Sequence, residues 1–171
     1  EEIRAVIPSA AETGNAQIEI TYGERTAPAV SVNLARATFG AFSANRKGYG
    51  QGSISNLTAD GNRADNFYLN SAKPGQVAAL LGTGLGPIAV DDSEAPPQGA
   101  LTVDVEELVG GRAAKVLYKG RSNCCSGLDE VRFEVPEGVT GCVVPVAVKA
   151  AGILSNHVSM AIAAEGGTCA N

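Results

Sequence analysis

Apolar and polar residues alternate with a period of two along most of this chain. The alternation is clearest in Ile18-Glu19-Ile20, Val30-Ser31-Val32-Asn33-Leu34 and Val131-Arg132-Phe133-Glu134-Val135. This period places one face of an extended strand on a core and the other face in water. Turn signals rich in Gly and Asn separate the runs, and helical spacing with caps is hard to find. The pattern predicts an all-β sandwich with strands near 2–8, 16–22, 28–36, 75–83, 100–108, 112–119, 128–136, 142–150 and 154–163.

The chain also contains an internal repeat. Residues 2–35 match residues 130–163 at a constant offset of 128 (130 minus 2). Glu2-Ile3-Arg4-Ala5-Val6-Ile7-Pro8 aligns with Glu130-Val131-Arg132-Phe133-Glu134-Val135-Pro136, and a one-residue deletion after Pro136 is cancelled by an insertion before Gly152. Further strand-like sequence precedes the second copy but not the first. We therefore expect one complete module and the C-terminal half of another.

The repeat divides the chain into three predicted parts. Residues 1–36 form the partial module, which we expect a neighbouring chain to complete, and residues 74–171 form the complete module with a C-terminal tail. Residues 37–73 lie between them and contain aromatic residues that would be unusual in a flexible linker, namely Phe39, Phe42, Tyr49, Phe67 and Tyr68. We predict that this connector packs on the modules.

The composition of the chain restricts which partners it could bind and in which cellular compartment it could lie. The 171-residue chain has a net charge of −5 and no basic stripe, so nucleic acid and anionic membranes are poor candidates. No apolar run approaches the length of a membrane span, about 20 residues. Neither an initiator Met nor a signal sequence is present, which is expected of a mature, processed product. With four cysteines, one histidine and no CxxC spacing, disulfides in an oxidising compartment are favoured over zinc.

The four cysteines allow three pairings. If a hairpin turns at Ala151-Gly152, the start of its first strand lies beside the end of its second, which brings Cys142 near the tail that holds Cys169. We therefore favour Cys142–Cys169, with Cys124 and Cys125 forming a vicinal disulfide or reaching another chain. The alternative is that one of Cys124 and Cys125 bridges to Cys142 or Cys169 and leaves two thiols.

Three glycine- or acid-rich segments could bind a nucleotide or a metal ion, but each fits a turn or loop better. Gly82-Thr83-Gly84-Leu85-Gly86 is similar to a dinucleotide loop, yet its third glycine comes one position early and no helix follows. Asp60-Gly61-Asn62-Arg63-Ala64-Asp65-Asn66 and Asp91-Asp92-Ser93-Glu94 could offer oxygen atoms to calcium, but neither has EF-hand spacing. We interpret all three as turns or solvated loops.

Catalytic groups are also poorly supported. His157 is the only imidazole, and alternation turns it outward, away from the apolar face of its strand. Glu106-Glu107 and Asp129-Glu130 are adjacent pairs whose members point to opposite faces, which does not suit paired carboxylate catalysis. The sequon Asn56-Leu57-Thr58 is formally a glycan acceptor, but it is a weak signal. We expect no catalytic residue, no cofactor and no metal site.

Several motifs together resemble a known family. They are Lys73-Pro74-Gly75-Gln76-Val77, Gly82 to Pro87, Tyr118-Lys119-Gly120-Arg121, Gly127 to Val131, Gly141 to Val146, Ser155-Asn156, Phe39 to Asn45 and Gly48 to Gly52. The chain is similar, over nearly its whole length, to an uncharacterised C-terminal domain of large secreted proteins of soil bacteria, which resembles immunoglobulin-like IPT or TIG modules. The resemblance implies an immunoglobulin-like β-sandwich and secretion to the bacterial cell surface. The family has no established activity, so it implies no catalytic residues.

These observations predict a non-enzymatic extracellular structural protein. In the first hypothesis the chain is a subunit of a filament or surface assembly, and a neighbouring copy completes the half module by strand complementation, head to tail. The apolar residues expected at that interface are Ile3, Ala5, Ile7, Ile18, Ile20, Val30, Val32 and Leu34. In the second hypothesis the chain is a spacer or adhesion module of a larger secreted protein, with an unidentified glycan or protein ligand.

Overall fold

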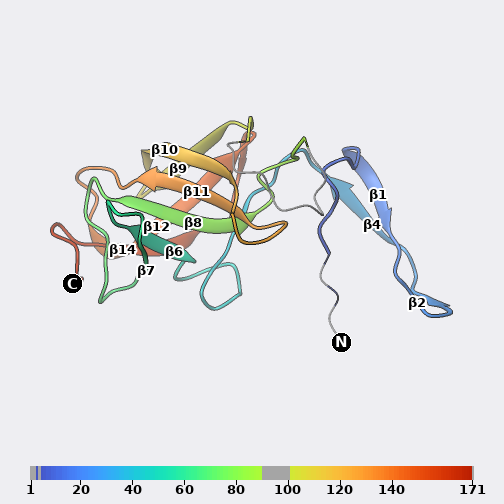
Figure 1. The fold of residues 1–171 in the computed structure, drawn as a ribbon, viewed down its shortest axis with the longest axis horizontal. Coiled ribbons are helices and arrows are strands. Elements are labelled where there is room, and N and C mark those ends of the chain that lie inside the picture. Colours follow the sequence, from blue (N-terminus) through green and yellow to red (C-terminus); the bar gives the residue numbers. More distant parts are fainter. Residues whose placement is uncertain (1–2, 4, 90–100, 171) are drawn as a thin grey trace.

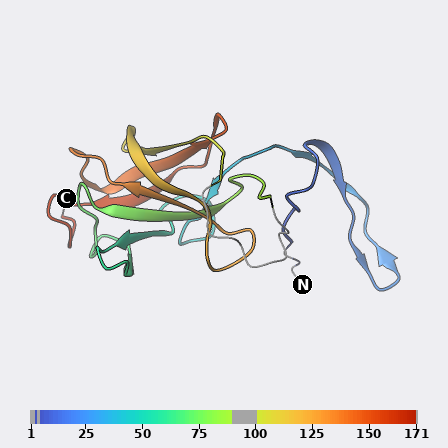
Figure 2. The same ribbon diagram turned by 45° about the horizontal axis from the view of Figure 1, so that its top comes forward.

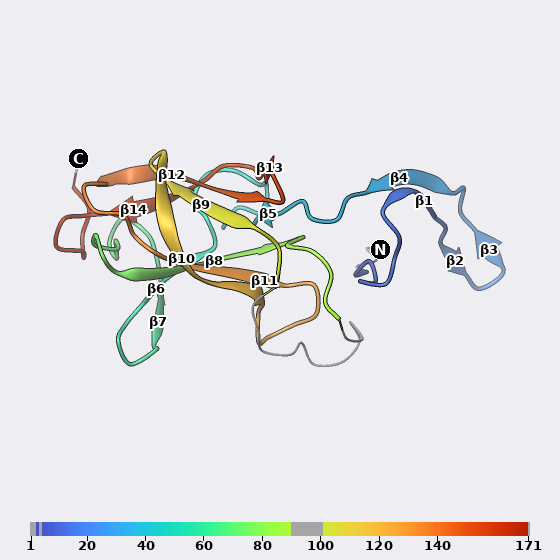
Figure 3. The same ribbon diagram turned by 90° about the horizontal axis from the view of Figure 1, so that it is seen from above.

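The computed structural model describes residues 3, 5–89 and 101–170 (Figure 1). All the described elements are β-strands, and each pair of strands is antiparallel, which confirms the predicted all-β class. A long hairpin over residues 14–34 projects from a two-layered β-sandwich formed by residues 37–163 (Figures 1 and 3).

The first layer of the sandwich is built around β8 (Val77–Thr83). One edge of β8 pairs with β11 (Asp129–Glu134), and the other edge pairs with β6 (Ile54–Leu57) and β5 (Gly40–Ala41). The short strand β7 (Arg63–Asp65) forms a hairpin with β6.

The second layer is built around β12 (Gly141–Ala150). One edge of β12 pairs with β9 (Val105–Val109), and the other pairs with β13 (Ile153–Leu154) and β14 (Val158–Ile162). β10 (Arg112–Arg121) connects the layers, because its first residues pair with β9 and the rest pair with β11 (Figure 3).

The core lies between the two layers. β8, β11, β12 and β14 each contribute apolar residues that are almost completely buried, among them Leu80, Val131, Phe133, Val146, Val148, Met160 and Ile162. In β11, β12 and β14 these are the positions at which the alternation of the sequence predicts an inward side chain.

The projecting hairpin is built from short strands (Figure 2). Along the chain they are β1 (Gly14–Ile18), β2 (Thr21–Tyr22), β3 (Arg25–Thr26) and β4 (Val30–Leu34). β1 pairs with β4, and β2 pairs with β3.

Three expectations about single strands were wrong. The strand expected over 2–8 is absent from its described residues, 3 and 5–8. The strand expected over 16–22 is divided into β1 and β2, and the strand expected over 154–163 is divided into β13 and β14. Residues 37–73 supply β5, β6 and β7, three strands that the sequence did not predict. They therefore form part of the first layer, and Phe39, Ala41 and Ile54 belong to the core.

Candidate assembly surface

The hairpin and the last three strands of the sandwich have the same pairing register. In the hairpin, Ala16 lies opposite Val32 and Ile18 opposite Val30. In the sandwich, Val144 lies opposite Met160 and Val146 opposite Val158, and each of these residues is offset by 128 from its counterpart in the hairpin. The repeat seen in the sequence is therefore also a repeat of backbone pairing.

The turn regions match as well. Tyr22 pairs with Arg25 as Ala150 pairs with Ile153. The amide of Ala27 donates to the carbonyl of Ile20 at 2.9 Å, and at the same offset the amide of Ser155 donates to the carbonyl of Val148 at 2.8 Å.

The additional residue in the second copy lies at a β-bulge. The register of β12 and β14 shifts between Gly141 and Val144, whereas Gly14 to Ala16 pair with β4 without a shift. The insertion that the sequence places before Gly152 is therefore taken up at the start of β12. A bulge accommodates one additional residue in a strand without changing the pairing beyond it.

In the sandwich, both edges of the β12–β14 unit are covered. On the β12 edge, β9 pairs from Val146 to Ala150. On the outer edge of β14, the amide of Ser159 donates to the carbonyl of Gly50 at 2.7 Å, and the amide of Ala163 donates to the carbonyl of Ala72 at 2.9 Å.

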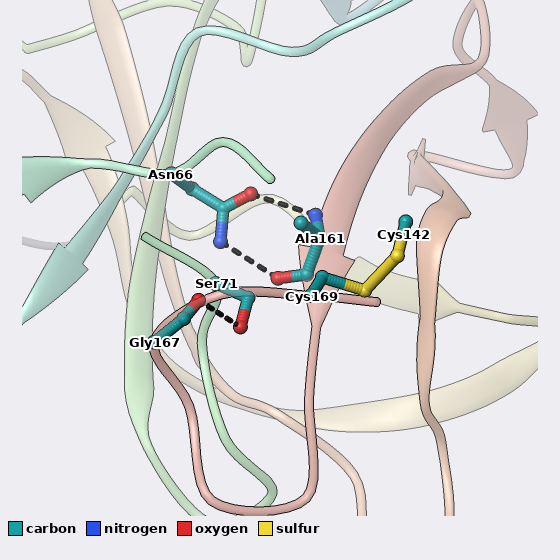
Figure 4. The surroundings of a disulfide bond; sticks show 6 residues. All are labelled: Asn66, Ser71, Cys142, Ala161, Gly167 and Cys169. Carbon is teal, nitrogen blue, oxygen red and sulfur yellow. Dashed lines mark hydrogen bonds between the residues drawn. A yellow bond between two sulfur atoms is a disulfide. The ribbon is translucent and has the colours of Figure 1, made fainter. Parts of the chain in front are cut away.

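The side chain of Asn66 covers the position between these two contacts (Figure 4). It accepts a hydrogen bond from the amide of Ala161 at 2.8 Å and donates one to the Ala161 carbonyl at 2.9 Å. Asn66 is itself buried and also donates to Asn56 at 2.9 Å. The amide side chain therefore replaces a strand at this point of the β14 edge.

The equivalent surfaces of the hairpin are uncovered by the described residues. Ile18 and Ile20 are 43% exposed and Val30 is 60% exposed, whereas Val146, Val148 and Val158, their counterparts in the sandwich, are at most 2% exposed. The outer edges of β1 and β4 have no strand beside them in the described chain. One apolar face and two strand edges thus come together on the hairpin, a combination typical of a surface that binds further strands.

The missing neighbours explain two breaks in the N-terminal copy. Glu19 and Ile20 separate β1 from β2, but their counterparts Ala147 and Val148 lie within the continuous strand β12, where they pair with β9. The region expected to form a strand over 2–8 corresponds to β11, which pairs with β8 and β10 in the sandwich. A strand needs a paired neighbour, and the hairpin has none at these positions.

The structure divides the predicted interface residues into two groups. Ile18, Ile20, Val30, Val32 and Leu34 lie in the hairpin and alternate as expected. Ile3, Ala5 and Ile7 are exposed and lie outside any strand, so they do not form the ordered face that the alternation predicts. In that segment Val6 instead approaches Gly127, where an added Cβ would lie 2.8 Å from the Val6 side chain.

The start of the connector is packed within its own chain. Ala37, Phe39 and Ala41 are buried in the core of their own sandwich. Gly82 and Gly84 allow this approach, since a Cβ on Gly82 would lie 2.3 Å from the Phe39 ring and one on Gly84 would lie 2.4 Å from the Thr38 carbonyl oxygen. Close packing against the connector is therefore the structural role of glycines in the segment over 82–86.

Both favoured disulfides are present. Cys142 at the start of β12 is bonded to Cys169 in the C-terminal tail, and Cys124 is bonded to Cys125 in an exposed loop. The tail is also held by Ser71, whose hydroxyl donates to the carbonyl of Gly167 at 2.7 Å (Figure 4). The backbone amide of Ser71 donates to the same carbonyl at 2.7 Å.

The remaining candidates occupy structural positions. His157 is exposed, as expected, and Asn56 of the sequon is buried and donates to the carbonyl of Asn70 at 2.8 Å, which argues against a glycan there. In the acidic segment over 60–66, residues 60–62 lie in the turn of the β6–β7 hairpin and residues 63–65 form β7. No cluster of metal-binding side chains occurs among the described residues. Residues 91–94 lie outside the described residues.

The two buried acidic residues of β11, Asp129 and Glu130, are held by arginines. Asp129 is buried against Arg121 and accepts a hydrogen bond from the Leu85 amide at 2.8 Å, although burial still raises its pKa. Burial also opposes ionisation of Glu130, but hydrogen bonds from Arg63 and Arg132 lower its pKa below the usual value. Each carboxylate has its own partners, so they do not form a catalytic pair.

Glu107 is the exception that sequence reasoning did not single out. Glu106 is exposed, as alternation requires, whereas Glu107 is completely buried in β9 and neither carboxylate oxygen has a hydrogen-bond partner in the described chain. Burial raises the pKa of Glu107 well above its usual value. The signal that could have revealed it is its place in Val105-Glu106-Glu107-Leu108-Val109, where it shares a face with two valines.

Comparisons with known proteins add no assignment. No family model, no curated protein and no solved structure matches the chain. The described residues include no helix that is long and apolar enough to cross a membrane.

Proposed function

We propose that this chain is a non-enzymatic structural segment of an extracellular bacterial protein built from immunoglobulin-like modules. In this proposal, residues 37–163 are one complete module, and the hairpin over 14–34 is the C-terminal half of a second, completed by the front strands of a neighbouring module. The observation that carries the proposal is the shared register of the hairpin and the β12–β14 unit.

The extracellular location is supported by the cysteines. All four are paired in disulfides, and stable disulfides are typical of oxidising compartments. The resemblance of the sequence motifs to modules of secreted bacterial proteins supports the same location.

The count of hairpin units and of front strands favours a polypeptide with several successive modules over a polymer of identical chains. The described residues form two units of the β12–β14 kind but only one set of front strands, β5 to β11, and that set is already used by its own sandwich. A homopolymer that exchanged these front strands would therefore leave one hairpin per chain uncovered. The buried segment over 37–41 also fixes the point at which the hairpin leaves the sandwich, as suits a spacer between modules.

A complementation experiment tests this proposal. A fragment spanning residues 37–140 contains β5 to β11 but lacks β12 to β14. Mixed with the full chain, it should gain β-structure and form a 1:1 complex by binding the hairpin. Ile18→Asp should abolish the complex, because a charge buried without a partner is strongly unfavourable. Gln17→Asp is the matched control, because Gln17 is exposed and lies on the other face of β1.

The second candidate is a head-to-tail filament of identical subunits. It is favoured by the apolar face of the hairpin, which the described chain leaves exposed and which a second copy could cover. Light scattering after size-exclusion chromatography distinguishes the two candidates. A stable monomer of 17.3 kDa over a wide range of concentration would reject the filament, while leaving the complementation experiment to decide the first proposal.

A further inference from the structure

The free edge of β1 defines how a partner strand would bind, because the direction of each backbone amide and carbonyl along the edge is fixed. The exposed apolar face does not define this. In the sandwich, the amide of Gly110 donates to the carbonyl of Pro145 at 2.8 Å, which places the Pro145 carbonyl on the β9 edge of β12. The Val148 carbonyl faces the other edge, where it accepts from Ser155. Since backbone groups alternate along a strand, Ala147 and Lys149 also direct their amides and carbonyls toward β9.

The same alternation applies to the hairpin. The carbonyl of Ile20 accepts from Ala27 within the hairpin, as that of Val148 accepts from Ser155. Glu19 and Thr21, which correspond to Ala147 and Lys149, therefore direct their backbone groups outward from the free edge. These are the groups that an added strand would pair with.

We propose that the outer edge of β1 and β2, from Ile18 to Tyr22, is a specific binding site for an antiparallel strand from a neighbouring module, in the register that β9 adopts on β12. This inference rests on the proposed function and names the strand that makes the first contact. The template is the pairing within this chain, where Val109 lies opposite Val146 and Val105 opposite Ala150.

The register defines the chemistry of the partner. Residues that take the places of Val109, Glu107 and Val105 lie opposite Ile18, Ile20 and Tyr22 and point to the same face as these side chains. The partner strand therefore has apolar residues at alternate positions, and it is followed by a second strand, as β9 is followed by β10. The partner is the front half of an immunoglobulin-like module of this type, rather than a folded ligand with a rounded surface.

The experiment uses the full chain and a synthetic peptide of residues 103–117, which carries β9 and the first part of β10. The ¹⁵N-labelled chain is titrated with the peptide and observed by NMR. We expect saturable shifts of the amides between residues 14 and 34, protection of the Glu19 and Thr21 amides from solvent exchange, and unchanged amides in the sandwich, where β12 already holds its own β9.

A paramagnetic label on the peptide tests direction and register. Placed at the position of Asp104, it should broaden the amides of Tyr22 and Gly23 and leave those of Gly14 and Asn15 sharp. If Gly14 and Asn15 broadened instead, or if the shifts centred on β4, the inference would be wrong. The hairpin would then bind a strand, but in another direction or on another edge.

Substitution of the edge provides a separate test. Glu19→Pro removes the outward amide without removing a donor from the β1–β4 pairing, and it should weaken peptide binding about tenfold, since it deletes one backbone hydrogen bond and introduces a ring at the contact. Glu19→Ala retains the amide and should bind as the parent does. The same peptide carrying Leu108→Pro should bind as weakly, because Leu108 lies opposite Ala147.

The outcomes separate this inference from the proposed function. If the fragment of residues 37–140 binds the hairpin but Glu19→Pro and the peptide have no effect, the inference is wrong and the proposed function stands. If neither the fragment nor the peptide binds, both are wrong.

Discussion

Glu107 occupies a position on the inward face of β9, where an apolar side chain is expected. It lies between Val105 and Val109 on the inward face, opposite Val148 of β12, and both of its oxygens are without partners in the described chain. Burying a carboxyl group without a hydrogen bond is unfavourable in either protonation state, and far more so when it is ionised. Glu107 therefore destabilises the core.

Replacing Glu107 should stabilise the protein, and the gain should depend on pH. The pKa of Glu107 is raised in the folded state, so below its unfolded value of about 4.5 both states bind the proton and ionisation does not affect stability. As pH rises above that value, the unfolded chain releases the proton while the folded chain retains it, so the free energy of unfolding falls until the folded pKa is reached.

Glu107→Met should thus raise the free energy of unfolding by about 1–3 kcal/mol at pH 4, the cost of an unpaired buried polar group, and by more at pH 7. Chemical denaturation of parent and variant between pH 4 and pH 8 measures the difference. Glu106→Met, at the exposed neighbouring position, is the control and should change little. A gain that is independent of pH would contradict the assigned pKa.

Asn66 is the opposite case, a buried polar side chain whose groups are all used. It bridges the β14 edge at Ala161 and also bonds Asn56. Asn66→Ala leaves the amide of Ala161 and the side-chain oxygen of Asn56 unpaired, whereas the Ala161 carbonyl still accepts from the amide of Ala72 at 3.0 Å. The substitution should lower the free energy of unfolding by about 2–5 kcal/mol, as expected for two buried groups without partners. Thermal and urea denaturation measure this loss, and the exposed Asn62→Ala should be nearly neutral. Equal effects of the two would show that water replaces the Asn66 side chain.

At the scale of elements, the sequence predicts the strands that bury one face in a core. It does not predict strands that form only because a neighbouring segment pairs with them. β8, β10, β11 and β12 were predicted to within two residues at each end, because each buries one face in a core. β5 and β7 are too short to show a period, and β5 exists because Gly82 and Gly84 permit a close approach that only the folded chain reveals. The strand expected over 2–8 alternates correctly but lacks a neighbour. For the candidate surface, the sequence predicted the residues of β1 and β4, but the edge of β1 became visible only from the pairing.

The two disulfides should contribute unequally to the stability of these elements. Cys142–Cys169 closes a loop of sequence separation 27 and attaches the tail to β12, whereas Cys124–Cys125 joins neighbouring residues. Because a disulfide stabilises mainly by restricting the unfolded chain, the double substitution Cys142→Ser/Cys169→Ser should cost about 2–4 kcal/mol. Cys124→Ser/Cys125→Ser should cost much less. Denaturation of both variants tests the order, and four thiols that react with alkylating reagent before reduction would reject both bridges and the extracellular location.

At the scale of the whole molecule, the same hairpin occurs in two environments. In the sandwich it is paired on both edges and buried on one face, and there its first strand, β12, is continuous and Val146, Val148 and Val158 are buried. In the N-terminal copy the register is unchanged, yet the first strand is interrupted between β1 and β2 and the face is open to solvent. Local sequence is therefore sufficient for the hairpin register, and the opposing strands supply the continuity.

This duplication permits one substitution to be compared at two equivalent positions. Ile18 and Val146 share a register position, but Ile18 is 43% exposed and Val146 is fully buried. Val146→Asp should unfold the sandwich, because the free-energy cost of a buried unpaired charge exceeds the free energy of unfolding of a domain of this size. Ile18→Asp should leave the melting temperature of the sandwich within about a degree of the parent value. Differential scanning calorimetry of the two variants measures the contrast. When the fragment of residues 37–140 is added in excess, the parent hairpin should acquire a melting transition of its own, and Ile18→Asp should abolish that transition. If Ile18→Asp lowered the melting temperature of the isolated chain as much as Val146→Asp, the hairpin would already be packed within its own chain and would not act as an acceptor for a neighbouring module.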